Sequence, residues 1–232
     1  MITSLFSYEI KFSKDFSKSI KQDLLVANVS IQVKKEDEVY VNGAVSKFAE
    51  YITSFSGDIE KNNSKYSVYP RYAYVNGEAI LKSYNGNLEY EFRSKDEESL
   101  NELLKQIILL KDGQDEVITV RSLSWKIDEK ELDSIFDELR IDAISWIKDY
   151  QKVLSKKINS TCKINDISFN TNYNRYSPRV QMNAVSNNKA SFANMPKLEQ
   201  TNKNVNYNVN YVLECRWLYA QETMKLLNML LL

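Results

Sequence analysis

Histidine is absent from this 232-residue chain, and its absence removes several kinds of active site. Neither a Ser-His or Cys-His nucleophile system nor an imidazole proton shuttle can be built. Most zinc and copper sites need imidazole or several thiolates, and only two cysteines are present, Cys162 and Cys215. The five glycines form neither the GxxxxGKS/T nor the GxGxxG phosphate-binding pattern. We therefore expect no catalytic residues, no metal site and no cofactor, and a chain that is not an enzyme.

An excess of charge and a long apolar run are also missing. Lys plus Arg and Asp plus Glu both number 31, so the formal net charge is zero. That balance argues against a nonspecific nucleic-acid partner and against polybasic membrane attachment. No segment approaches the roughly 18 apolar residues that span a bilayer, so we expect no integral membrane segment. The start, MITSLFSYEI, is not a typical export leader, which leaves two alternatives: a cytoplasmic chain, or an exported chain without its leader.

Apolar periodicity divides the chain into strands and helices. Two-residue alternation predicts strands, and apolar residues at three- and four-residue spacing predict helices. Outside the tyrosine-rich region, the expected strands are 24–33, 116–127, 162–169 and 205–213. The expected helices are 37–55, a segment containing Leu100 to Ile108, and a long one from Asp128 to about Ile158.

The long helix allows two interpretations. Leu132, Phe136, Leu139 and Ala143 alternate four- and three-residue steps, as a coiled-coil seam does. Ile135, Ile144, Ile147 and Leu154 widen this stripe. A wide apolar stripe favours a helix that lies across a sheet.

A tyrosine-rich stretch, YSVYPRYAY at residues 66–74, reads as a strand with two aromatic faces. Alternation places Tyr66, Val68, Pro70, Tyr72 and Tyr74 on one face and Tyr69 and Arg71 on the other. Tyr69, Arg71 and Tyr72 form a candidate binding surface, because such side chains stack on sugars, bases or cations. The alternative is a structural role, since tyrosine favours strands.

Two Asn-Gly dipeptides follow this stretch. Asn76-Gly77 separates two alternating runs and predicts a type I′ hairpin turn. Asn85-Gly86 carries the same local signal and predicts a second hairpin turn. A β-bulge within one long strand is the alternative.

The two cysteines lie at corresponding ends of two late strands. Cys162 opens one expected strand and Cys215 closes another. If these strands pair antiparallel, the start of one lies beside the end of the other, which allows a disulfide. Two buried free thiols are the alternative. A disulfide would imply an oxidising compartment.

The later part of the chain contains two segments without a clear place in the fold. Residues 171–204 are Asn-rich and long for a loop, so they are disordered, form a hairpin arm, or make an interaction. Residues 217–232 form an apolar C-terminal tail, which we expect to pack on the core or on a partner subunit.

The succession of elements resembles the SIMPL-domain family. The residues that carry the resemblance run from LLVANVSIQV through KFAEYI, YSVYPRYAY, SYNGNLEYEF, ITVRSLSWKI and LRIDAISWIKDYQKVLSKKI to VNYVLEC, about residues 20–216. The resemblance implies an α+β fold, with an antiparallel β-sheet packed with helices and one long helix before the last two strands. It places residues 1–216 in one SIMPL-like domain, as a single body or two closely packed lobes. It also implies that SYNGNLEYEF is one strand with a bulge at Asn85-Gly86.

The same resemblance guides the expected function. It implies a periplasmic or secreted location, homo-oligomerisation and a role in stress defence, and it supplies no active-site residue. Our first hypothesis is therefore a non-enzymatic exported envelope protein that works as a homo-oligomer. The second is a glycan-binding module that uses the tyrosine-rich strand 66–74. The third is a carboxylate-dependent hydrolase, which would need two convergent acids in a cleft.

Overall fold

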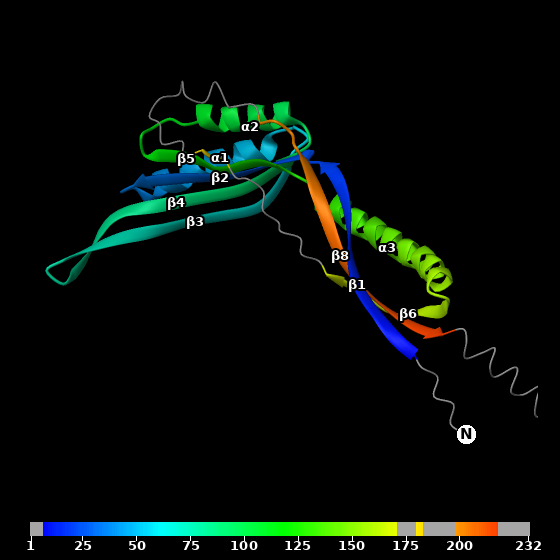
Figure 1. Ribbon diagram of the computed structural model, residues 1–232. Helices are drawn as coiled ribbons and strands as arrows, with labels where there is room; N and C mark the ends of the chain where they lie inside the picture. Colours follow the sequence, from blue (N-terminus) through cyan, green and yellow to red (C-terminus); the bar gives the residue numbers. More distant parts are fainter. Residues whose placement is uncertain (1–6, 171–179, 183–197, 218–232) are drawn as a thin grey trace, which may run out of the picture. The chain divides into compact units, whose positions relative to one another are not determined.

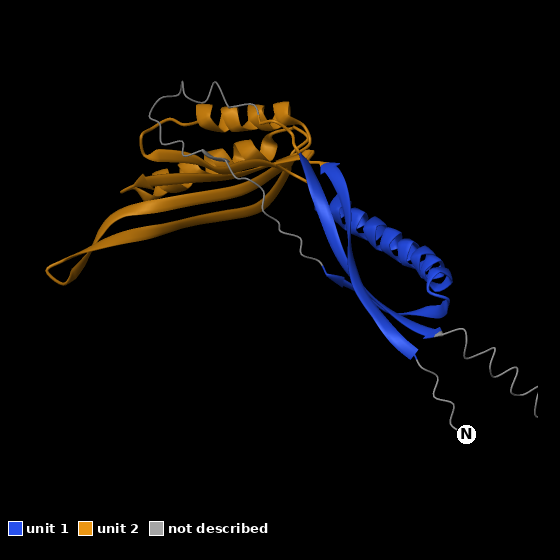
Figure 2. Cartoon of the chain, in the orientation of Figure 1, with its two compact units in different colours: residues 1–20, 129–175, 202–232 blue, residues 21–128, 176–201 orange. Residues whose placement is uncertain are grey.

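The computed structural model describes residues 7–170, 180–182 and 198–217, and it confirms the α+β class. The chain forms two compact units, which Figure 2 distinguishes by colour. Unit 1 comprises residues 1–20, 129–175 and 202–232, and unit 2 comprises residues 21–128 and 176–201. The expected domain boundary at residue 216 stays a prediction, because residues 218–232 lie outside the described part of the chain.

Unit 2 is a five-stranded antiparallel sheet with two helices on one face (Figure 1). Its strand order is β3-β4-β2-β5-β7. The elements are β2 (Leu24–Lys35), α1 (Glu38–Ser54), β3 (Glu60–Val75), β4 (Glu78–Ser94), α2 (Glu97–Leu109), β5 (Glu116–Lys126) and β7 (Val180–Met182). Alternate residues of β2, such as Ala27 and Ile31, join the core beneath the helices.

Helix α1 forms where the sequence predicted it. The Asp37 side chain caps its start by accepting hydrogen bonds from the N–H groups of Val39 and Tyr40 at 2.8 and 3.3 Å. Its buried stripe is Val41, Val45, Phe48 and Ile52. These residues follow the three- and four-residue spacing that places one face of a helix on a sheet.

Unit 1 is a three-stranded sheet, in the order β1-β8-β6, with the long helix α3 packed against it. The elements are β1 (Ser7–Lys21), α3 (Glu129–Lys157), β6 (Ser160–Asn170) and β8 (Asn202–Trp217). Helix α3 buries Leu132, Ile135, Phe136, Leu139, Ala143 and Ile147. This wide stripe confirms the helix-on-sheet interpretation over the coiled-coil seam.

The Asn-Gly dipeptides at 76–77 and 85–86 have different structures. Asn76 and Gly77 both have positive φ, 54° and 88°, and form the hairpin turn between β3 and β4 as predicted. The second hairpin turn predicted at Asn85-Gly86 is wrong, because β4 runs through it as one strand. The expected bulge is also absent from that dipeptide: both ladders pass it in register, and the irregularity falls at Lys82.

Several features differ from the sequence-based expectations. The sheet is split in two, and strands β1 and β7 were not predicted. Most of the Asn-rich segment, residues 171–179 and 183–197, lies outside the described residues, as does the apolar tail beyond Trp217. Within the described part of the chain, no helix combines the length and apolarity that crossing a membrane requires.

Candidate functional site

The predicted binding surface does not form a single face. Tyr69 and Arg71 lie on β3 opposite Asn85 and Ser83 of β4, on the sheet face away from the helices. Tyr72 lies on the other face, because successive strand residues alternate. All three side chains are exposed, and Tyr69 and Tyr72 keep 49% and 56% of their surface. Tyr69 and Arg71 can thus share a ligand, whereas Tyr72 belongs to a different surface.

Two other tyrosines, Tyr66 and Tyr84, contact helix α1 or the core beneath it. The Tyr66 hydroxyl donates to Asn42 Oδ1 at 2.7 Å. Tyr84, which faces Pro70 across the ladder, packs against the core. Desolvation, followed by the charge of Glu38 and a hydrogen bond to it, raises the pKa of Tyr84. Tyr66, which belongs to the tyrosine-rich stretch, and Tyr84, which lies outside it, therefore both contact the helix side of the sheet.

The β3–β4 pair continues past the ends of α1 and α2 as a projecting hairpin (Figure 1). We call residues 69–82 the tyrosine hairpin. Its exposed large apolar side chains are Tyr69, Tyr72, Tyr74, Val75, Ile80 and Leu81. Tyr74 is the most exposed, at 79%. Cross-strand pairing places Tyr72, Tyr74 and Leu81 on one face, and Val75 and Ile80 on the other.

The sheet face away from the helices is largely polar where β3, β4 and β2 lie side by side. Neighbouring strands contribute cross-strand rows such as Lys65, Glu89 and Ser30, and Ser67, Asn87 and Gln32. Among the described residues of unit 2, no helix covers this face. A sheet face without an apolar layer does not contribute to a core, so it remains available for a polar ligand.

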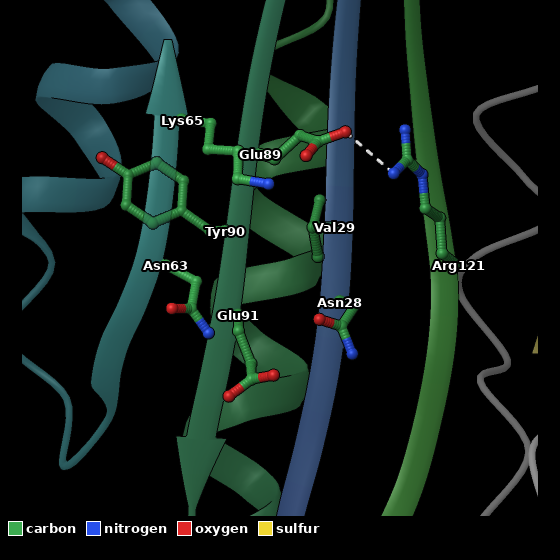
Figure 3. Close-up of a pocket in the computed structure, with 8 residues that line it drawn as sticks. All are labelled: Asn28, Val29, Asn63, Lys65, Glu89, Tyr90, Glu91 and Arg121. Carbon is green, nitrogen blue, oxygen red and sulfur yellow. Dashed lines mark ion pairs between the residues drawn. The ribbon is translucent and has the colours of Figure 1, made fainter.

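A depression of about 270 Å³ lies on this polar face (Figure 3). Its lining residues are Asn28, Val29, Asn63, Lys65, Glu89, Tyr90, Glu91 and Arg121. Figure 3 shows the Lys65 side chain reaching from β3 across β4. Ligand pockets for drug-sized molecules begin near 300 Å³, so this depression has room only for a small polar molecule.

Both carboxylates in the depression form ion pairs. Arg121 forms an ion pair with Glu89 at 2.8 Å and donates to Ser30 Oγ at 3.0 Å. Arg93 forms an ion pair with Glu91 at 2.7 Å. Each carboxylate that lines the depression therefore already has a guanidinium partner. This arrangement suits recognition of a polar, uncharged group better than acid–base chemistry, which needs a carboxylate that can exchange its proton.

Two polar atoms on the same face are buried without a hydrogen-bond partner, Ser83 Oγ and Asn85 Oδ1. They belong to alternate residues of β4, directly across the ladder from Arg71 and Tyr69. Ser83 is only 4% exposed. An unpaired buried polar group costs about 1–3 kcal/mol, so a ligand that supplied hydroxyl groups here would recover free energy.

Unit 1 contains the disulfide expected from the sequence. Cys162 and Cys215 are directly opposite in the β6–β8 ladder, with Cα atoms 4.0 Å apart, and they are bonded. Both residues are buried, and Gln151 Nε2 donates to the Cys162 carbonyl at 2.5 Å. The bond joins strands on either side of a 53-residue separation. Closing a loop of this length stabilises a fold by about 4 kcal/mol in the chain-entropy description.

An aromatic cluster fills the space between α3 and the three-stranded sheet. The Tyr211 ring lies 5.3 Å from Phe12 and 5.7 Å from Trp146, measured between ring centroids. Its hydroxyl donates to the Ala143 carbonyl at 3.2 Å. Burial raises the pKa of Tyr211 to about 12. This cluster is core rather than a ligand site.

Sequence reasoning missed the polar face, although a signal for it exists. Strand β4 carries Asn85, Asn87, Glu89 and Glu91 at two-residue spacing. This alternation marks one polar face, but it does not show that the face stays uncovered. Within the described residues, no group of three or more Asp, Glu, His or Cys side chains is arranged to hold a metal ion.

Comparison with known proteins gives one family match. The profile of the SIMPL family, "Protein of unknown function (DUF541)", matches residues 12–213. A search of curated proteins gives no match. Among solved structures, the chain is similar to "De novo designed protein Foldit4", at 19% identity and a TM-score of 0.25, over 42% of this chain and 93% of the designed one. A similarity this weak carries no argument about fold or function.

Proposed function

Because the chain belongs to the SIMPL family, whose function is unknown, we propose a function from its own geometry. The chain is a non-enzymatic, exported protein of the cell envelope that works as a homo-oligomeric assembly and contributes to stress defence. The observation that carries this proposal is the buried disulfide between Cys162 and Cys215. Such bonds persist in oxidising compartments and are rare in a reducing cytoplasm. The paired carboxylates of the polar face support a binding or structural role over catalysis.

The location is tested on protein taken directly from the cells that make it. Acid quenching followed by thiol labelling under denaturing conditions should show Cys162 and Cys215 fully protected until reductant is added. Fractionation should recover the chain outside the cytoplasm. A cytoplasmic chain with two reactive thiols would contradict the proposal. Deletion of the gene should lower survival under oxidative challenge, and unchanged survival would remove the stress-defence part.

Assembly is tested by absolute mass from light scattering, with and without reductant. The exposed apolar side chains of the tyrosine hairpin support association, since monomers rarely expose such patches. We expect a discrete mass above that of the monomer. Loss of that mass only with reductant would tie assembly to the Cys162–Cys215 bond.

A second candidate function is glycan binding on the polar face. It is favoured by the unpaired Ser83 Oγ and Asn85 Oδ1, which lie across the ladder from Arg71 and Tyr69. A sugar stacked on the Tyr69 ring would bring hydroxyl groups to these atoms. Because Tyr72 lies on the opposite face, Tyr72→Ala is a matched control for Tyr69→Ala. Loss of retention on a glycan array for Tyr69→Ala alone supports this candidate, whereas equal retention by both variants and the unmodified chain rejects it.

A further inference from the structure

The tyrosine hairpin, residues 69–82, exposes apolar side chains on both faces and makes no contribution to the core of its own unit. Tyr72 and Tyr74 are 56% and 79% exposed on one face, and Val75 and Ile80 are 45% and 43% exposed on the other. Two strands alone have no interior, so these side chains gain nothing from the fold of one copy. Contiguous exposed apolar surface of this kind marks an interaction site.

The free edge of β3 is a poor place for a partner strand. β3 is the edge strand of its sheet, and Pro70 lies within the exposed part of it. A proline in an edge strand has its missing N–H on the free side, so an added strand would lose a hydrogen bond there. Lys65 and Arg71 add charge along the same edge. A partner therefore docks on the side-chain faces of the hairpin.

The charges on the face with Val75 and Ile80 make it self-complementary. Glu78 lies at the tip end, paired with Val75 across the ladder. Arg71 lies at the opposite end of the same face, near the body of the sheet. When two such faces stack antiparallel, Glu78 of each copy reaches Arg71 of the other, and Ala73 and Ile80 of the two copies meet in the middle. A two-fold contact requires this kind of self-complementary surface.

We propose that the tyrosine hairpin docks face to face on the tyrosine hairpin of a second copy of this chain, through the face that carries Val75 and Ile80. This inference rests on the proposed homo-oligomeric function and names its contact. The face with Tyr72, Tyr74 and Leu81 stays exposed in such a pair. A second contact, through the face with Tyr72, Tyr74 and Leu81, would join such dimers into larger oligomers.

The contact is small. Aromatic side chains bury about 150–250 Å² each, so the exposed apolar side chains of one hairpin amount to about 500 Å² over both faces. A stable interface takes about 800 Å² from each partner. Association through the hairpin alone is therefore weak and depends on protein concentration, and its measurement needs a concentration series.

Sedimentation velocity of the full chain over a range of concentrations tests the proposal. Ile80→Lys places a charge on the docking face, and Leu81→Lys places one on the other face. Val39→Lys is the matched control, because Val39 is 81% exposed in the same unit but lies on α1, outside the hairpin. The unmodified chain and Val39→Lys should rise above the monomer mass in the same way. Leu81→Lys should stop at the dimer, and the double variant should remain a monomer.

A cysteine introduced on the docking face gives an independent measurement. Ala73 lies between Val75 and Arg71 on that face, so Ala73→Cys should form a disulfide-linked dimer under mild oxidation, while Val39→Cys should not. If the variant with both Ile80→Lys and Leu81→Lys keeps the mass of the unmodified chain, the hairpin contact is wrong, but the proposed homo-oligomer is not contradicted. A monomeric double variant without cross-linking at Ala73→Cys would overturn the assigned face. An unmodified chain that is monomeric at every concentration would overturn both the contact and the proposed assembly.

Discussion

Gly86 of β4 lies directly against Val45 of α1, so closely that a Cβ on Gly86 would be 2.6 Å from Val45 Cγ2. It would also be 2.8 Å from Val41 Cγ1. Neither distance is compatible with a side chain unless the helix or the valines move. The glycine is therefore needed for the close approach of a helix to the sheet, and not for a turn.

Gly86→Ala should destabilise the chain by about 1–3 kcal/mol, the usual cost of overpacking a core. Gly43→Ala is the control, because Gly43 lies in α1 and a Cβ there meets nothing within 4 Å. Alanine is the better helix former, so Gly43→Ala should stabilise by about 0.5–1 kcal/mol. Denaturant unfolding of both variants checks the opposite signs. Equal effects would show that α1 does not pack on Gly86.

The Asn-Gly pair at Gly86 also shows where sequence reasoning stops. Periodicity predicted α1, the long helix and strands β2, β5, β6 and β8, because each of these elements buries one regular face. The turn at Asn76-Gly77 was predictable for the same local reason. At Asn85-Gly86 the glycine is needed because α1 packs closely against it. This contact joins segments that are distant in sequence, so the local sequence does not reveal it.

Two further features were missed, for different physical reasons. Strand β1 carries a clear alternation, with Tyr8, Ile10 and Phe12 half-buried, but its partner β8 is almost the whole chain away. Tyr69 and Arg71 lie on one face and Tyr72 on the other, as the two-residue period indicated, and their role as a binding surface stays a prediction. The unpaired atoms of Ser83 and Asn85 could not be predicted, because hydrogen-bond partners depend on what packs around them.

Removal of the disulfide should loosen unit 1 selectively. The double variant Cys162→Ala with Cys215→Ala should lose about 2–4 kcal/mol, because the loop between the two strands is no longer closed in the unfolded chain. Amide hydrogen exchange should quicken in β6 and β8. Strands β2 and β4 belong to the other unit and serve as the internal control. Uniform quickening throughout the chain would contradict separate units.

Alkaline pH should lower the unfolding free energy of unit 1, because the buried Tyr211 phenol ionises less readily in the folded chain. Burial raises its pKa from 10.0 to about 12, so the unfolded chain releases this proton at a lower pH than the folded chain. The stability held by the neutral phenol is complete below pH 10 and falls as pH rises from 10 to 12. The expected loss is about 1–2 kcal/mol once solvent screening is included.

Tyr211→Phe isolates this effect. The variant should be weaker at neutral pH by about 1 kcal/mol, because the hydrogen bond to the Ala143 carbonyl is lost. Its unfolding free energy should then fall less steeply than that of the unmodified chain above pH 10. Urea unfolding at a series of pH values measures the difference. Parallel curves for the two chains would mean that Tyr211 ionises as easily in the folded state as in the unfolded one.

The Asn-Gly dipeptides at 76–77 and 85–86 should also deamidate at different rates. Deamidation requires the Gly nitrogen to attack the Asn side-chain carbonyl, expel ammonia, and form a succinimide that then adds water. Asn76 and Gly77 are exposed at the hairpin turn, where the backbone can reach this geometry. Asn85 and Gly86 are held in register between β3 and β2, and Gly86 is buried. A held, extended backbone keeps the attacking nitrogen away from the carbonyl.

Peptide mapping after incubation at mildly alkaline pH should therefore find aspartate and isoaspartate at position 76, with Asn85 intact. After unfolding in urea the two sites should react at similar rates, because the sequence Asn-Gly is then the only determinant. Gly77→Ala should slow the reaction at Asn76 in both states, since a side chain hinders the attack. Early deamidation of Asn85 in the folded chain would mean that β4 opens at Gly86, and would contradict the continuous strand.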